Sequence, residues 1–134
     1  MKHLFKSALL ALALLPVLGA CERPEARVRN VAESFLNVYF AGDYAAAADF
    51  CTPELRVWVD RMAEKIETVP EETQQKIKEA LGQTSFNIVS VEVDEKAGSA
   101  VVRYDVSVPG IEKPVPKKLL LKLEGRTALV NHVE

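Results

Sequence analysis

Two cysteines are the residues of this 134-residue chain with the widest range of possible chemistry. Cys21 ends the apolar run "LPVLGAC", whereas Cys51 lies in the segment "DFCTPE". A cysteine becomes a nucleophile or a metal ligand where its neighbours favour the thiolate. For Cys21 the residues leave three roles open: the end of a transmembrane helix, a disulfide with Cys51, or the attachment of a lipid.

The first twenty residues have the organisation of a secretory signal peptide. Lys2 and Lys6 precede an apolar stretch over residues 8–18, and small residues follow it. A membrane-spanning helix needs about 20 apolar residues, and this stretch is shorter, contains Pro16 and ends beside charged residues. We therefore expect residues 1–20 to be removed from the mature chain.

The segment Leu18-Gly19-Ala20-Cys21 resembles the lipobox of bacterial lipoproteins. The resemblance implies cleavage between Ala20 and Cys21 and a diacylglycerol thioether on the Sγ atom of Cys21. Each buried CH₂ of such a lipid contributes about 0.8 kcal/mol, and a stable anchor needs more than one acyl chain. The other interpretation is an ordinary signal peptide that happens to precede a cysteine.

The residues after Cys21 indicate in which membrane the protein would be anchored. Residue 22 is Glu, whereas Asp at this position favours inner-membrane retention in the Gram-negative sorting pattern. We therefore expect a lipid anchor in the outer membrane and a domain that faces the periplasm. Residues 21–27 form the expected lipidated tether, in which arginines can meet anionic head groups at about 1 kcal/mol each. A tether that touches no lipid is the alternative.

Composition and motifs exclude several classes of function. The net charge of −2 loses Lys2 and Lys6 on processing, and there is no basic stripe, so nucleic acid is not an expected partner. The sequence has no His/Cys/Asp cluster with metal-ligand spacing, no glycine-rich phosphate loop and no Gly-x-Ser-x-Gly motif. We expect no cofactor, no metal and no catalytic residue in one domain over residues 28–134.

The clearest predicted element is a helix over about residues 27–41. Helical spacing places one set of apolar residues on its buried face: Val28, Val31, Ala32, Phe35, Leu36, Tyr39 and Phe40. Gly42 ends this helix, and Asp43 caps a short helix over residues 44–51.

Two further helices follow. The first begins at the Thr52-Pro53 pair, since proline at the first helical position loses no hydrogen bond. Its predicted buried face carries Leu55, Trp58, Val59, Met62 and Ile66. The second begins at Pro70 and ends at Gly82.

After residue 82 the apolar pattern alternates, which is typical of strands. Four strands are predicted over residues 85–93, 101–108, 117–124 and 127–133. Short connections rich in glycine and proline favour hairpins between them. The sequence therefore predicts an α+β fold with N-terminal helices packed on a curved antiparallel meander.

Residues 35–55, "FL…AGDYAAAADFCTPEL", and the meander after them resemble small bacterial lipoproteins with a nuclear transport factor 2-like (NTF2-like), or cystatin-like, domain. The resemblance covers residues 27–133. This family often ends with Gly-x-Trp-x-(Val/Ile), whereas here Gly125 is present but Ala128 stands where a bulky aromatic residue is expected. The resemblance implies a sheet that curls around the long helix and a cone-shaped cavity, which is catalytic in steroid isomerases and polyketide cyclases.

A cavity enzyme needs a base and a hydrogen-bond donor that converge in an apolar space. The possible cavity-lining residues are Tyr39, Trp58 and Tyr104, although core packing accounts for each of them as well. The possible bases are Asp43, Asp49, Asp60 and Asp105, and Asp105 should face away from Tyr104 on its strand. We expect His132 to face solvent and Cys51 to be a buried, unreactive thiol.

The sequence thus predicts a lipid-anchored envelope protein whose domain binds a small apolar ligand or an envelope protein without catalysis. One alternative is a cavity enzyme of the isomerase or cyclase type. Another is an accessory protein that docks on an envelope complex through its sheet.

Overall fold

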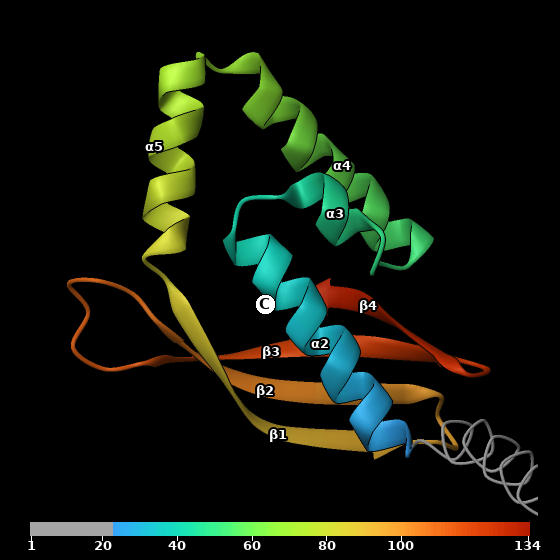
Figure 1. The fold of residues 1–134 in the computed structure, drawn as a ribbon. Helices are drawn as coiled ribbons and strands as arrows, with labels where there is room; N and C mark the ends of the chain where they lie inside the picture. Colours follow the sequence, from blue (N-terminus) through green and yellow to red (C-terminus); the bar gives the residue numbers. More distant parts are fainter. Residues whose placement is uncertain (1–22) are drawn as a thin grey trace, which may run out of the picture.

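The computed structural model of the chain describes residues 23–134, so the predicted signal peptide, its cleavage site and Cys21 lie outside the described residues. The described part consists of helices followed by strands (Figure 1). The helices are α2 (Pro24–Phe40), α3 (Tyr44–Ala48), α4 (Pro53–Thr68) and α5 (Glu71–Gly82). The strands are β1 (Ser85–Asp94), β2 (Ser99–Ser107), β3 (Val115–Glu124) and β4 (Thr127–Val133). The predicted α+β order is confirmed.

The strands form one antiparallel sheet in the order β1-β2-β3-β4, which is the predicted meander. The pairing of β1 with β2 shifts register between Ile88 and Ser90, and that of β3 with β4 shifts between Leu120 and Leu121. Bulges of this kind bend a strand and increase its twist, so the sheet is curved.

The long helix α2 begins at Pro24, three residues before the predicted start. Proline suits the first helical turn, and Glu25 lies near the positive end of the helix dipole. Residues 24–27, which we expected in the tether, are therefore helical. Within residues 23–134 no helix combines the length and the apolar character needed to cross a membrane.

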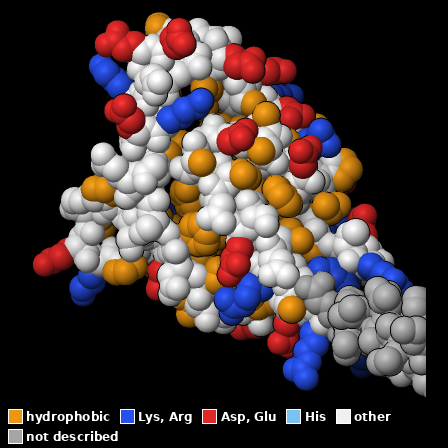
Figure 2. All heavy atoms as spheres, in the orientation of Figure 1, with side chains coloured by type: hydrophobic (Ala, Val, Ile, Leu, Met, Phe, Trp, Pro, Cys, Tyr) orange, Lys and Arg blue, Asp and Glu red, His pale blue; other side chains and the backbone are white. Residues whose placement is uncertain are grey.

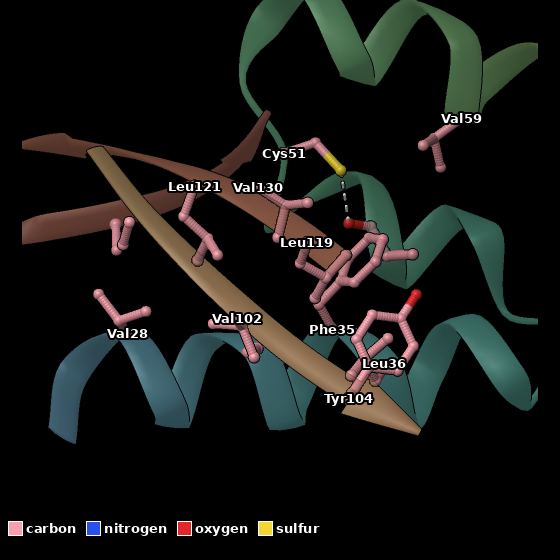
Figure 3. Packing of buried hydrophobic residues seen from close by; sticks show 14 of the residues in the cluster. Val28, Phe35, Leu36, Cys51, Val59, Val102, Tyr104, Leu119, Leu121 and Val130 are labelled. Atoms are coloured by element: carbon pink, nitrogen blue, oxygen red, sulfur yellow. Dashed lines mark hydrogen bonds between the residues drawn. The ribbon is translucent and has the colours of Figure 1, made fainter. Parts of the chain in front are cut away.

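The core is the layer between α2 and the sheet (Figure 3). Phe35 and Leu36 are fully buried, as predicted, and the sheet side of this layer includes Val102, Leu119 and Leu121. The buried residues of β2 and β3 alternate with more exposed ones, as expected for a sheet with one covered face.

The segment between α3 and α4 closes the β4 edge of the sheet. The backbone N–H of Val130 donates to the Phe50 carbonyl at 2.7 Å, and the N–H of Thr52 donates to the Val130 carbonyl at 2.9 Å. The Thr52 hydroxyl accepts from the N–H of Leu55 and donates to the Asn131 side chain at 2.9 Å. Because this pairing needs extended backbone, α3 ends at Ala48 rather than at the predicted residue 51.

Trp58 is the main departure from the predicted core. Its side chain is 45% exposed, whereas the next residue, Val59, is fully buried. The buried side of α4 is a narrow stripe that also includes Leu55 and Met62, and Trp58 lies at its outer margin. The prediction of a buried Trp58 is therefore wrong.

Candidate functional site

An aromatic cluster lies at the C-terminal end of α2. The ring of Tyr39 stacks on Phe35 with centroids 5.3 Å apart, and it meets Tyr44 edge-on at 5.4 Å. Phe40 lies edge-on to Tyr39 at 5.5 Å and stacks on Phe86 of β1 at 6.0 Å. Each such pair contributes about 0.5–1.5 kcal/mol beyond its buried area. The cluster therefore joins α2, α3 and the start of the sheet.

Three tyrosines near this cluster have raised pKa values. Burial, with smaller effects of nearby Tyr39 and Glu134, raises the pKa of Tyr104 to about 12. Burial raises the pKa of Tyr39, with an added effect of Tyr44, and burial also raises the pKa of Tyr44. All three hydroxyls are therefore protonated at neutral pH and able to donate.

The aspartates considered as bases do not join these tyrosines. Asp43 accepts from the backbone N–H of Ala46 at the start of α3. Asp49 and Asp60 both pair with Arg56, at 3.7 and 3.8 Å. Asp105 faces the side of β2 opposite to Tyr104, as predicted. Each of the four carboxylates therefore has a place outside the tyrosine cluster.

Cys51 and His132 also lie where the sequence predicts. Cys51 is a buried free thiol whose Sγ donates to the Ala47 carbonyl at 3.3 Å (Figure 3). Burial raises its pKa to about 11, so the reactive thiolate is scarce at neutral pH. His132 is exposed. Among residues 23–134 no group of His, Cys, Asp and Glu side chains is arranged to hold a metal ion.

The three possible cavity-lining residues lie in two places. Tyr39 and Tyr104 are close enough to interact electrostatically, one on α2 and one on β2. Trp58 lies on the outer side of α4. The structure therefore brings the two tyrosines together and leaves the tryptophan apart.

An open groove lies between α3, α4 and α5, just outside the aromatic cluster. It has a volume of about 530 Å³ and is lined by Ala41, Gly42, Asp43, Tyr44, Ala45, Ala63, Ile66, Glu67, Gln74 and Lys78. Hydrophobic side chains are visible in the hollow between α5 and the rest of the domain (Figure 2). Tyr44 belongs to both the groove wall and the cluster, so the two features are continuous.

Sequence reasoning missed this groove. Its alanines occur in two separate segments, and nothing in their spacing reveals that α5 stands beside them. A second hollow, of about 800 Å³, lies at the other end of α2, between Arg23 and the β1–β2 turn. The groove beside Tyr44 is the candidate site because it combines small residues, an adjoining aromatic cluster and a charged rim.

Comparisons with known proteins find one distant structural likeness. No protein-family model matches the chain, and no curated protein matches it. Among solved structures, it is similar to an NTF2-like protein of unknown function from Cytophaga hutchinsonii, with 11% identity and a TM-score of 0.40. The match covers 79% of this chain and 88% of that chain. The likeness carries no statement about what this chain binds.

Proposed function

We propose that this chain is a bacterial envelope lipoprotein with an NTF2-like domain that binds another envelope protein, without catalysis. The protein-binding part of this proposal depends on one observation, the filled layer between α2 and the sheet. Phe35, Leu36 and Leu119 in that layer are fully buried, and Tyr104 and Leu121 are 2% exposed. Since side chains occupy the space where the cone-shaped cavity was expected, the outer surface is left for binding.

The anchoring part depends on the lipobox-like segment before Cys21 and on the start of α2. Only Cys21, Glu22 and Arg23 separate the predicted lipid from the helix, and three residues reach about 10 Å at most. Pro24 and Arg27 share a hollow with Gly98 and Gly125 of two hairpin turns. In the proposed arrangement, these turns and the start of α2 lie next to the periplasmic face of the outer membrane.

The anchor is tested by labelling cells with radioactive palmitate. The wild-type chain should carry the label and fractionate with the outer membrane, and Cys21→Ser should remain as an unlabelled, uncut precursor. Cys51→Ser is the matched control and should keep the label. A mature wild-type protein with a free Cys21 thiol would refute the anchor.

Protein binding is tested in cells by site-specific photo-crosslinking from the full chain. A benzoylphenylalanine at Ala45 samples the groove, one at Leu120 samples the outer face of the sheet, and one at Trp58 samples the outer side of α4. We expect a discrete, heavier adduct from Ala45. An adduct from Leu120 alone would favour docking through the sheet. No adduct from any position, together with a saturable rise of the melting temperature on adding a steroid, would favour the cavity enzyme.

A further inference from the structure

The groove between α3, α4 and α5 has the features of a peptide-binding surface. We propose that it binds an amphipathic segment of a partner protein, with Leu or Ile side chains in the groove and Lys or Arg side chains at its rim. This inference rests on the proposed protein-binding function, and it names the site and the chemistry of the partner.

The groove stays open because α5 does not pack into the core. No residue of α5 is buried, and its half-buried residues Gln74, Ile77 and Leu81 lie on one side of the helix. Ile77 and Leu81 do not belong to the hydrophobic core or to the residues packed against it. The apolar side of α5 is therefore only partly covered, which leaves area for a partner to bury.

Small residues make the groove accessible to side chains. Ala41, Ala45 and Ala63 line it, and none of them extends beyond a methyl group. α5 lies close to Gly42, in the turn after α2, because a Cβ there would lie 3.3 Å from Cγ of Lys78 and 3.4 Å from Cδ1 of Leu81. Because Gly42 has no side chain, α5 can lie close to this turn. The alanines leave room in the groove for an aliphatic side chain of a partner.

The charge at the rim favours a basic partner. Glu67 lines the groove, Glu64 lies one turn before it on the same side of α4, and Glu71 begins α5. No ion pair of the described residues involves any of these three carboxylates. Acidic side chains are visible over this end of the molecule (Figure 2).

The basic residues of α4 lie on its other side. At about 100° per residue, Arg61 and Lys65 share the stripe of exposed Trp58 rather than that of Glu67. Lys78 is the basic residue among the groove-lining side chains, and its stem lies across Gly42. A segment with several Lys or Arg residues can therefore meet Glu67 and Glu71 away from Arg61 and Lys65, whereas Glu64 lies three residues after Arg61 and borders both sides of α4.

The anchor leaves this groove free. The 17-residue helix α2 is about 25 Å long, and the groove begins at Ala41, directly after its last residue. The predicted lipid lies beyond its first residue. The two ends of α2 therefore separate membrane attachment from the groove, so a partner can reach the groove while the chain is anchored.

The test uses the mature lipoprotein in phosphatidylcholine nanodiscs and a fluorescein-labelled peptide of Leu and Lys, about 14 residues long, which makes four helical turns. A peptide in which Glu replaces every Lys is the comparison probe, and empty nanodiscs give the background. Fluorescence anisotropy should show saturable binding of the Leu/Lys peptide and at least about tenfold weaker binding of the Leu/Glu peptide. Salt should weaken the binding.

Matched variants on the two sides of α4 locate the binding. Ala63→Phe fills the groove and Glu67→Lys reverses its rim, and each should weaken the Leu/Lys peptide at least about tenfold. Lys65→Phe and Arg61→Glu change side-chain size and charge on the outer side of α4, and neither should weaken binding of the Leu/Lys peptide. Melting curves of all four variants establish that each is folded.

Three results would overturn the assignment: equal binding of both peptides, wild-type binding by the groove variants, or a loss shared by the outer-side variants. If palmitate labelling and a crosslink from another position succeed while the peptide test fails, only the groove assignment fails. If no position gives a crosslink, the proposed protein-binding function fails together with the groove assignment.

Discussion

The layer of α2 and the sheet differs sharply from the α4–α5 hairpin, although all three long helices are amphipathic. α2 has Val28, Ala32, Phe35 and Leu36 buried, whereas α4 has Val59 alone and α5 has no buried residue. Helical periodicity shows which side of a helix is apolar but not how completely that side is covered. The first region buries its apolar residues in the core, whereas the second leaves part of them exposed.

Besides the packing of α4 on the core, two joints between the regions can be tested by mutation. At the first joint, Phe50 and Thr52 bond to the backbone of Val130 on β4. At the second, Gly42 lies against Lys78 and Leu81 of α5. Mutations in the core, at each joint and at the tyrosine cluster should therefore have effects of graded size.

The largest effect is expected in the core. Phe35→Ala should lower the free energy of unfolding by about 3–5 kcal/mol, because a fully buried phenyl ring is replaced by a cavity. Trp58→Ala is the control and should cost less than about 1 kcal/mol, since its larger side chain is 45% exposed. Urea unfolding followed by circular dichroism measures both. Equal losses in the two variants would contradict the contrast between the regions.

An intermediate effect is expected at the first joint. Thr52→Val should cost about 2 kcal/mol, because it removes both the cap on the N–H of Leu55 and the bond to Asn131. Thr52→Ser keeps the hydroxyl and should lie within about 1 kcal/mol of wild type. In a double-mutant cycle with Asn131→Ala, the two losses should not add. Additive losses would mean that the Thr52–Asn131 bond contributes nothing to stability.

A smaller effect is expected at the second joint. Gly42 has a φ of +79°, and alanine in this left-handed region costs about 1–2 kcal/mol. Gly42→Ala should also speed amide hydrogen exchange in α5 more than in α2, since its Cβ would lie 3.3 Å from Cγ of Lys78, closer than ordinary contact. Gly82→Ala is the matched control, because nothing lies within 4 Å of its added Cβ. Uniform acceleration across both helices would show that α5 is not an independent part.

Much of the fold was predictable because local signals mark its boundaries. Asp43 and Thr52 cap helices as their sequence positions indicate, and the alternation in residues 101–108 identifies the covered face of β2. The exposure of Trp58 was not predictable from such local signals. Its spacing from Leu55 and Met62 suits a buried face, but only the width of the packed stripe decides which residues of that face are covered.

The candidate site was less predictable than the fold. Tyr39 and Tyr104 come from α2 and β2, and the alternation of β2 correctly placed Asp105 on the other side from Tyr104. The groove depends on the angle at which α5 leaves α4 near Pro70. That angle is set by contacts between distant residues, such as Gly42 with Leu81, and no local pattern encodes it.

The smallest effect at neutral pH is expected in the tyrosine cluster. Tyr104→Phe removes a hydroxyl that takes part in none of the side-chain hydrogen bonds of the described residues, so its stability at neutral pH should be close to that of wild type.

The difference in stability between Tyr104→Phe and wild type should appear at alkaline pH. The folded-state pKa of Tyr104 is raised from 10.0 to about 12, mainly by burial, so the folded chain holds this proton more tightly than the unfolded chain. The stability linked to Tyr104 is therefore fully present below pH 10 and is lost as the pH rises from 10 to about 12. Urea unfolding across this range should show a steeper decline for wild type than for Tyr104→Phe, and phenolate absorbance should show one fewer late-titrating group in the variant. Parallel declines would mean that burial of the Tyr104 hydroxyl does not account for the loss of stability in alkali.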